Sequence, residues 1–291
     1  MTYAGIINIF KPPGMTSHDV VSKIRKILKT KKVGHTGTLD PDAVGVLPIC
    51  IGKATRLAEY LTSDEKTYRA ILTFGSETDT QDSSGKVVKE TSLPEISIEQ
   101  FSQILNSFLG EIEQIPPMYS AIKIQGQPLY KLARQGQEVP RKARTIYIHD
   151  LKLLEFDRKK ALLEITCSKG TYIRSLCEDI ARACNSSGHM SFLIRTKSGN
   201  FSIDEAFTLE EVASTPLEEI FIRPADALNF PQVITNEVTE KIVRNGNKLS
   251  LNLIDTQIME DQKYKVVTKE GELLAVASLK KDYLQPEKVL G

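Results

Sequence analysis

The chain has 291 residues, of which 41% are hydrophobic and 26% charged, a composition typical of a soluble globular protein with one large domain and a small one. A chain this long buries about three quarters of its unfolded surface, so its core requires neither disulfides nor a metal ion. The net charge of +1 does not exclude a basic face for phosphates, because residues 11–32 carry seven Lys and Arg against one Asp, whereas residues 204–219 carry six acids and no base.

The cysteines and histidines argue against a metal site. The four cysteines include no C-x-x-C pair and the four histidines show no paired spacing, so we expect no metal and cysteines that lie in the core in a reducing compartment. The longest nearly apolar run, residues 43–51, falls far short of the ~20 residues of a membrane helix. The N-terminus also lacks a signal-peptide pattern. We therefore expect a cytoplasmic protein that does not contact membranes.

The first predicted helix follows Thr16. The spacing from Thr16 to Asp19 is that of a capping box, and the apolar residues that come next recur at helical intervals. Basic residues fall mostly on the opposite face, so the sequence predicts an amphipathic helix with a basic exposed side. Charge alone leaves two interpretations open, a phosphate-binding surface and an ordinary solvated face.

The loop from Gly34 to Gly45 has a composition that suits close approach to a ligand. It contains three glycines, one proline and two carboxylates in twelve residues. Pro41 restricts Asp40 to extended conformations and removes a backbone donor, which presets the direction of the carboxylate. These facts alone favour an ordinary Asp-Pro turn. The G-x-x-G at residues 34–37 resembles a KH loop only superficially, and no lysine follows it as in a P-loop.

Two strands and a second helix are predicted in the middle of the chain. Residues 66–75 alternate in polarity and place Tyr68 with the apolar set, and residues 161–167 form another strand before a helix that starts at about Thr171. Arg174 then lies in the first helical turn, where the macrodipole disfavours a cation. It needs a compensating partner, either Glu178 one turn later or an anionic group across a cleft, and the sequence leaves both open.

The last third of the chain predicts an arm and a small domain. Prolines and glycines interrupt the basic segment 115–145, so it cannot be one regular element and we expect a surface arm. After residue 225, residues 265–279 predict a hairpin that turns at residues 269–272. We expect a β-rich domain over 226–291 after a larger domain over 1–225, with the boundary uncertain by about ten residues. Long meanders with intervening helices favour an α+β fold.

Six motifs in a fixed order resemble the TruB family of tRNA pseudouridine-55 synthases. The match extends over about residues 5–201. One such motif would be weak evidence, but six in the family's order are not expected from coincidence. The motifs are KPPGMTS at residues 11–17, GHTGTLDP at 34–41, KTYR at 66–69, TDTQDSSG at 78–85, PPMYSAIK at 116–123 and GTYIR at 170–174.

The resemblance implies an α+β catalytic domain around a mixed sheet over residues 1–225. It also implies that the arm at about 115–145 grips the T stem-loop of tRNA, and that residues 226–291 form a PUA-like RNA-binding domain, which the predicted hairpin fits only loosely. The implied activity is the isomerisation of uridine 55 to pseudouridine by base flipping and an aspartate nucleophile. This reaction needs no redox change, hydrolysis, metal or other cofactor, and no protein partner.

The resemblance assigns the chemistry to three residues. Asp40 would be the nucleophile, Tyr68 would stack on the target base and assist proton transfer, and Arg174 would pair with Asp40. These assignments reverse the weighting of Asp40, which by composition alone is a turn residue.

Five further residues would bind or support the substrate. His35 would contact RNA beside the flipped uridine, Tyr172 and Leu193 would line the base pocket, Lys11 would support the site, and Asp82 would join its polar shell. Each has a plainer interpretation: the apolar and aromatic residues, Tyr68 included, as core residues, and Lys11 and Asp82 as surface charges.

One position departs from the family pattern. Members often carry two consecutive arginines where this chain has Ile194-Arg195, which weakens that position as an RNA contact. Two rival functions remain. A non-catalytic tRNA-binding or RNA-folding protein would lack Asp40, Tyr68 or Arg174, and a catalytic subunit that depends on a guide RNA would not need its own basic arm.

Overall fold

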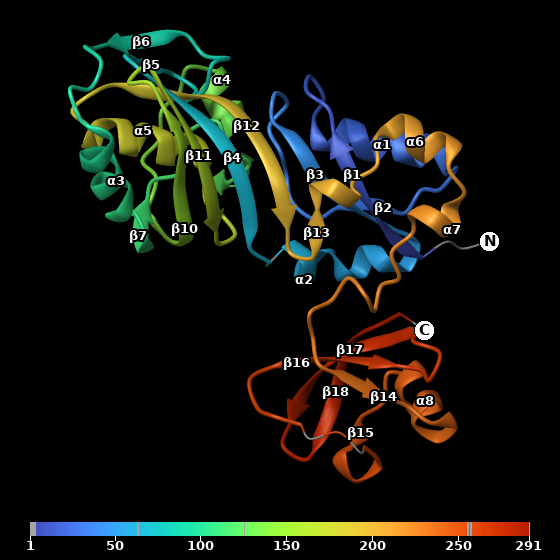
Figure 1. Cartoon of the computed structure of the whole chain (residues 1–291). Helices are drawn as coiled ribbons and strands as arrows, with labels where there is room; N and C mark the ends of the chain where they lie inside the picture. Colours follow the sequence, from blue (N-terminus) through green and yellow to red (C-terminus); the bar gives the residue numbers. More distant parts are fainter. Residues whose placement is uncertain (1–3, 63, 125, 255, 257, 291) are drawn as a thin grey trace. The chain divides into compact units, whose positions relative to one another are not determined.

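The computed structural model describes residues 4–62, 64–124, 126–254, 256 and 258–290. The contacts among them divide the described residues into two compact units (Figure 1). The first lies within Met1–Pro41, Gly45–Ser63 and Gly199–Gly291, and the second within Asp42–Val44 and Asp64–Ser198. Strands and helices of both units confirm the predicted α+β class. Within the described ranges, no helix is long and apolar enough to span a membrane.

The second unit is built on long antiparallel strands. Their order in the sheet is β12 (Gly188–Ser198), β4 (Lys66–Phe74), β11 (Lys160–Cys167), β10 (Arg144–Phe156) and β7 (Gly110–Gln114). Burial alternates along β4, as its sequence predicts, with Tyr68 on the buried face. β11 ends at Cys167, directly opposite Lys66. The helix that follows β11 therefore begins at the end of β4 that carries Tyr68.

That helix, α5 (Ile173–Ala183), packs on β12 and β4. It starts two residues after the predicted position. Most of its buried residues are apolar, and the buried polar ones are Arg174 and Ser175. A second helix, α3 (Ile98–Asn106), contacts β10 and α5. All four cysteines are buried, as expected of core residues, and burial raises the pKa of the Cys167 and Cys184 thiols to about 11.

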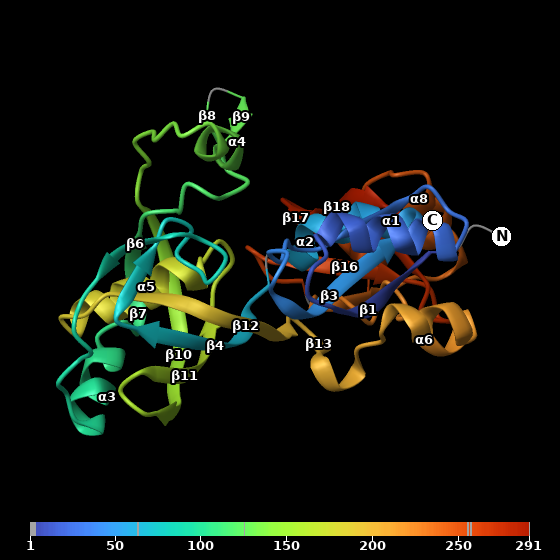
Figure 2. The same cartoon turned by 90° about the horizontal axis from the view of Figure 1, so that it is seen from above.

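Two excursions leave the sheet of the second unit. The strands β5 (Ser76–Thr78) and β6 (Val87–Glu90) form a hairpin, and residues 115–143 form the arm. Figure 2 shows the arm standing away from the sheet. The arm contains only short elements, namely β8 (Lys123–Ile124), β9 (Gln127–Pro128) and α4 (Leu129–Arg134). The prediction that no single regular element spans this segment is confirmed.

The first unit begins with three strands and a helix. β3 (Val44–Ile51) pairs antiparallel with β1 (Gly5–Lys11) and with β2 (Val33–His35). The predicted helix is α1 (Ser17–Ile27), and the Thr16–Asp19 capping box is present. Shorter elements complete this part, namely η1 (Gly52–Leu57), α2 (Ala58–Thr62), β13 (Phe201–Ser202), η2 (Ile203–Glu205), α6 (Leu209–Ser214) and α7 (Leu217–Ile220).

The C-terminal segment forms a five-stranded sheet with a helix, α8 (Glu237–Arg244), packed on it. The strand order is β14 (Gln232–Ile234), β16 (Lys263–Val267), β17 (Leu273–Lys280), β18 (Tyr283–Val289) and β15 (Leu249–Ser250). The short helix η3 (Leu251–Leu253) directly follows β15 in the chain. The β16–β17 hairpin confirms the predicted one, whereas β14 pairs with β16 in parallel.

The hydrophobic core of the C-terminal segment has two parts. One is internal to the segment and surrounds the fully buried Tyr264. The other is shared with the start of the chain, since Val276 and Leu290 belong to the same buried cluster as Ile6 and Leu57. The predicted domain division at residue 225 stays a prediction, because this segment has its own core and also buries residues against the N-terminal strands.

Gly188 permits the close packing of α5 on the sheet. A Cβ at this position would lie 2.5 Å from the Cβ of Ala181 and 2.9 Å from Cδ1 of Leu72. We expect Gly188→Ala to lower the free energy of unfolding by about 1–3 kcal/mol, because the helix must move off the strands. Urea denaturation measures this change. The control is Gly34→Ala, whose nearest neighbour would be Thr55 at 4.0 Å; equal stability of the two variants would contradict the packing argument.

Candidate active site

The backbone is anchored on both sides of Asp40. On one side, the amide of Leu39 donates to Oγ of Ser17 at 2.8 Å, and the same hydroxyl donates to the Leu39 carbonyl at 3.1 Å. On the other side, the carbonyl of Pro41 accepts from Nζ of Lys11 at 2.9 Å and from the amide of Gly14 at 3.0 Å. Ser17 and Leu39 are both buried. The half-buried Asp40 therefore projects from a fixed stretch of backbone.

Lys11 is not a surface charge. Its side chain is fully buried, and its Nζ also donates to the Pro12 carbonyl at 2.8 Å. A buried ammonium group is tolerated where hydrogen bonds satisfy it, and the acceptors Pro12 and Pro41 lie in the motifs at residues 11–17 and 34–41.

His35 is the last residue of β2 and is half-buried, and its Nδ1 accepts a hydrogen bond from the amide of Gly37 at 3.3 Å. Lys11, His35 and Asp40 thus all belong to the first unit.

Tyr68 and Leu193 share one face of the sheet in the second unit. Tyr68 lies opposite Arg195 across the β4–β12 pair, and Leu193 lies opposite Ala70. Directly opposed residues of antiparallel strands point to the same face. This is the face that α5 covers, because the Cβ of a residue at position 188 would meet that helix. Tyr68 and Leu193 are 8% and 7% exposed.

Arg195 is a buried residue beside Tyr68 that the sequence did not identify as a candidate for the site. It is 1% exposed and lies beside Tyr68 on the buried face. In the sequence it appeared only as part of the Ile194-Arg195 departure. The signal that reveals it is the strand register, since a one-residue shift would have turned it to the opposite face.

Arg174 is buried at the start of α5 and joins three segments. Its Nη1 donates to the Thr80 carbonyl at 3.0 Å and its Nη2 to the Tyr119 carbonyl at 2.9 Å. Its Nη1 also lies 3.5 Å from Oδ2 of Asp82. These oxygens offset the unfavourable macrodipole at this position. The alternative partner considered from sequence, Glu178, pairs with Arg182 instead, one turn further along the helix.

Asp82 lies in a tight loop that presents it to Arg174. Its Oδ1 accepts from the Thr80 hydroxyl at 2.7 Å and from the Ser84 amide at 3.0 Å, which leaves Oδ2 toward the guanidinium. Gly85 closes the loop, because a Cβ there would lie 2.4 Å from side-chain oxygens of Asp79 and Thr80. Asp82 is therefore held in an ion pair rather than solvated as an isolated surface charge.

Tyr172 is fixed through its backbone. Gln114, which is 2% exposed, accepts from the Tyr172 amide at 2.8 Å and donates to its carbonyl at 3.0 Å. The half-buried ring is set just before α5, next in sequence to the buried Ile173. No local pattern in the sequence points to Gln114, because its partner is 58 residues away.

The described ranges show no cluster of three or more His, Cys, Asp or Glu side chains that could hold a metal ion. The candidate residues offer a carboxylate, a phenol and buried cations. Lys11, His35 and Asp40 lie in one unit, and Tyr68, Asp82, Tyr172, Arg174 and Leu193 lie in the other.

Lys66 is a buried cation at the Tyr68 end of β4. Burial, and secondarily the charge of Arg195, lowers its pKa to about 8. Below about pH 8 the folded protein carries a buried charge that water would solvate better, and this lowers the free energy of unfolding. Between about pH 8 and 10.5, Lys66 is neutral in the folded state but still charged in the unfolded state, so this reduction shrinks as the pH rises. The free energy of unfolding should therefore rise between about pH 8 and the ordinary lysine pKa of 10.5.

We expect Lys66→Met to raise stability at pH 7 by at least about 1 kcal/mol. The advantage should shrink as the pH rises from 8 to 10.5. Thermal unfolding across this pH range measures it. The exposed Lys159, replaced by Met, is the control for loss of one charge; a constant advantage of Lys66→Met at all pH values would refute the buried-charge explanation.

Comparisons with known proteins identify the family of the chain. The family described as TruB family pseudouridylate synthase (N terminal domain) matches residues 25–173, and the tRNA pseudouridylate synthase B C-terminal domain matches residues 174–228. The tRNA pseudouridine synthase B of Alkaliphilus oremlandii is 49% identical over 87% of this chain and 85% of its own length. The protein of the same name from Caldanaerobacter subterraneus subsp. tengcongensis is 43% identical over 99% and 100%.

Solved structures resemble the chain over nearly its whole length. A chain of a Cbf5-Nop10-Gar1 complex has a TM-score of 0.79 and 28% identity, and covers 99% of this chain and 85% of its own. A chain of an H/ACA RNP bound to a substrate RNA containing 2′-deoxyuridine has a TM-score of 0.78 and 26% identity, with the same coverage. With its motifs, its fold and these relatives, the chain belongs to the TruB family of pseudouridylate synthases.

Proposed function

We propose that this protein converts uridine 55 in the T loop of tRNA to pseudouridine, with Asp40 as the nucleophile. The observation that carries the proposal is the anchoring of the backbone on both sides of Asp40, which fixes the point from which one half-buried carboxylate projects. The relatives that share 43–49% identity carry the name tRNA pseudouridine synthase B, which supports tRNA as the substrate.

The residue types fit the reaction. The bond between the uracil nitrogen and the ribose breaks, and the uracil ring rejoins the same sugar carbon through one of its ring carbons. This ring carbon then loses its proton, and the freed nitrogen gains a proton. The isomerisation needs no oxidant, water or metal. A carboxylate nucleophile must be ionised, and Arg174 approaching within ~4–6 Å would lower the pKa of Asp40. Tyr68 supplies a stacking surface and a hydroxyl for proton transfer.

The target base must leave its stacked position to reach Asp40. Extrusion costs a few kcal/mol, which contacts to phosphates offset. In this proposal, His35 contacts the RNA beside the flipped nucleotide and Tyr172 and Leu193 line the base pocket. Lys11 and Asp82 act indirectly, Lys11 through the backbone beside Asp40 and Asp82 through Arg174.

The protein acts, in this proposal, in the cytoplasm and without a cofactor or a protein partner. The non-catalytic alternative is disfavoured because Asp40, Tyr68 and Arg174 are all present. The RNA-guided alternative is disfavoured because relatives named tRNA pseudouridine synthase B are 43–49% identical to this chain, whereas the chain from the H/ACA RNP is 26% identical. The basic arm at 115–145 gives the chain its own means of holding the T stem-loop.

Replacement of Asp40 by Ala should abolish conversion of uridine 55 in an unmodified tRNA transcript, because the other carboxylate of that loop, Asp42, is exposed rather than half-buried. Binding of tRNA should stay within several-fold of wild type. Chemical mapping of pseudouridine and a filter-binding titration measure the two effects. Asp42→Ala, which removes the exposed carboxylate two residues along, should keep full activity. Full activity of Asp40→Ala would disprove the nucleophile assignment.

Ser17→Ala should lower kcat by roughly ten- to a hundred-fold with little change in KM, because small displacements of a reacting group are costly. Steady-state kinetics on tRNA measures both constants. The matched control is Thr16→Ala, which removes the adjacent hydroxyl that caps α1. It should cost about 1 kcal/mol of stability and leave kcat unchanged. Equal kcat losses in the two variants would mean that Ser17 acts only through helix stability.

A further inference from the structure

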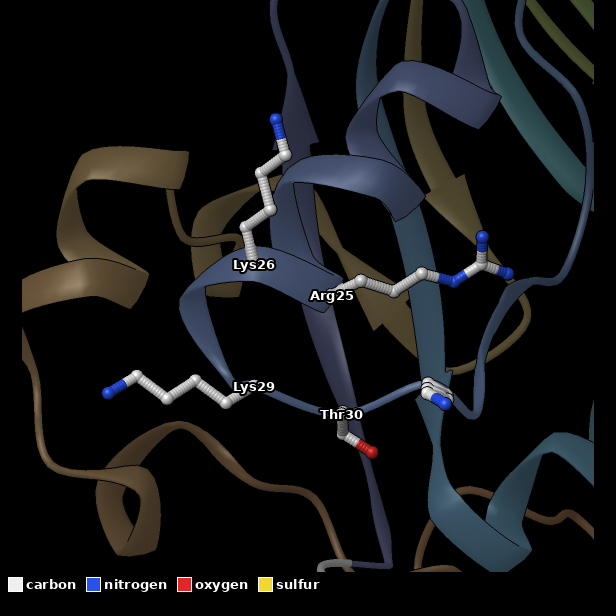
Figure 3. A pocket seen from close by; sticks show the side chains of 5 residues that line it. Arg25, Lys26, Lys29 and Thr30 are labelled. Atoms are coloured by element: carbon white, nitrogen blue, oxygen red, sulfur yellow. The ribbon is translucent and has the colours of Figure 1, made fainter.

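The end of α1 is surrounded by cations that have no acidic neighbours in sequence. Residues 20–39 contain six Lys and Arg and no Asp or Glu. Four of these cations and one threonine line a hollow of about 330 Å³, namely Arg25, Lys26, Lys29, Thr30 and Lys31 (Figure 3). In Figure 3 the side chains of Arg25, Lys26 and Lys29 diverge around the helix end.

These cations form no ion pair with any residue that the structure describes. Among the described residues, no carboxylate lies within 4.0 Å of Arg25, Lys26, Lys29 or Lys31, whereas elsewhere Arg69, Arg223 and Arg244 all form ion pairs. Nη2 of Arg25 donates to the Val33 carbonyl at 3.1 Å. Its Nε is buried and has no acceptor in the described part of the chain. The hollow therefore keeps a strong positive potential.

The helix dipole accounts for only part of this cluster. Cations in the last turn of a helix are favourable, but the effect falls off within that turn. Lys29 lies beyond the last helical residue with a φ of 48°, and the Thr30 amide donates back to the Arg25 carbonyl at 3.2 Å. This left-handed turn reverses the chain, so that Lys31 contributes to the same hollow. Two of the four cations thus come from outside the helix.

The hollow lies at a fixed spacing from the proposed nucleophile. The first residue of α1, Ser17, holds Leu39 next to Asp40, and the hollow is at the other end of the same helix. Eleven residues of α-helix span about 16 Å. An RNA whose target nucleotide lies at Asp40 would have backbone phosphates within this range.

A second hollow lacks this charge character. It measures about 890 Å³ and lies in the second unit between the arm, β7 and α5. Five acids and two arginines line it, and both arginines already pair with acids of the same hollow, Arg141 with Glu138 and Arg182 with Glu178. Its net negative lining would repel phosphates, whereas the hollow at α1 attracts them.

We propose that the hollow at the end of α1 is a binding subsite for backbone phosphates of the substrate RNA, separate from the base pocket. This inference rests on the proposed function for the identity of the RNA. The contact is electrostatic and independent of base sequence. It contributes to the affinity for the RNA and not to the chemical step.

The test compares two triple variants on an unmodified tRNA transcript. Lys26→Gln/Lys29→Gln/Lys31→Gln removes three cations of the hollow. The control, Arg158→Gln/Lys159→Gln/Lys160→Gln, removes three exposed cations of the β10–β11 turn, where Arg158 has a φ of 67°, similar to Lys29. Lys160 pairs with Thr73, five residues along β4 from Tyr68, or about 17 Å from the candidate site.

We expect the hollow variant to bind tRNA roughly ten-fold more weakly at moderate salt, with kcat unchanged at saturating tRNA. Its plot of log Kd against log salt should be shallower by about 0.7–0.9 for each lost phosphate contact. The control should match wild type. A hollow variant with wild-type affinity and salt dependence would overturn the proposal. Absence of pseudouridine formation by the wild-type protein would instead disprove the proposed function, while the binding comparison still decides on the subsite.

Discussion

The position of Asp40 in the first unit depends on the pair of contacts that hold the backbone around it. Ser17 bonds to both backbone groups of Leu39, and Lys11 bonds to the carbonyl of Pro41. Neither contact alone would fix the backbone of Asp40, since a residue can rotate about one anchored neighbour. With both neighbours anchored, the backbone of Asp40 is restricted before the substrate binds. The entropic cost of fixing this residue is therefore part of folding and not of substrate binding.

Arg174 has a comparable role in the second unit. A guanidinium group buried in the first turn of a helix would be unfavourable on dipole and desolvation grounds. The carbonyls of Thr80 and Tyr119 and the carboxylate of Asp82 compensate for both. The same bonds tie the start of the arm and the 78–85 loop to α5, so the position of Arg174 depends on segments far apart in the chain.

Charge is distributed according to these roles. The buried cations Lys11 and Arg174 have backbone carbonyls as partners, and some surface cations of the second unit pair with acids, such as Arg69 with Glu164. The cations at the end of α1 have no such partners among the described residues. A net charge of +1 is therefore compatible with a region of positive potential that remains available to an anionic ligand.

The sequence by itself determined the local elements and the family. The capping box at Thr16, the alternation along β4, the hairpin β16–β17 and the start of α5 within two residues all follow from short-range periodicity and capping. The ordered motifs named Asp40, Tyr68 and Arg174 as candidates. Each of these signals involves residues close in sequence, where spacing alone decides which side chains share a face.

Only the tertiary structure decided which partners these residues have. Ser17 meets Leu39 across 22 residues, Gln114 meets Tyr172 across 58, and Arg174 meets Thr80 across 94. Arg195 lies beside Tyr68 because of the strand register. Pairings over such separations arise from the packing of whole elements, so no local pattern in the sequence encodes them.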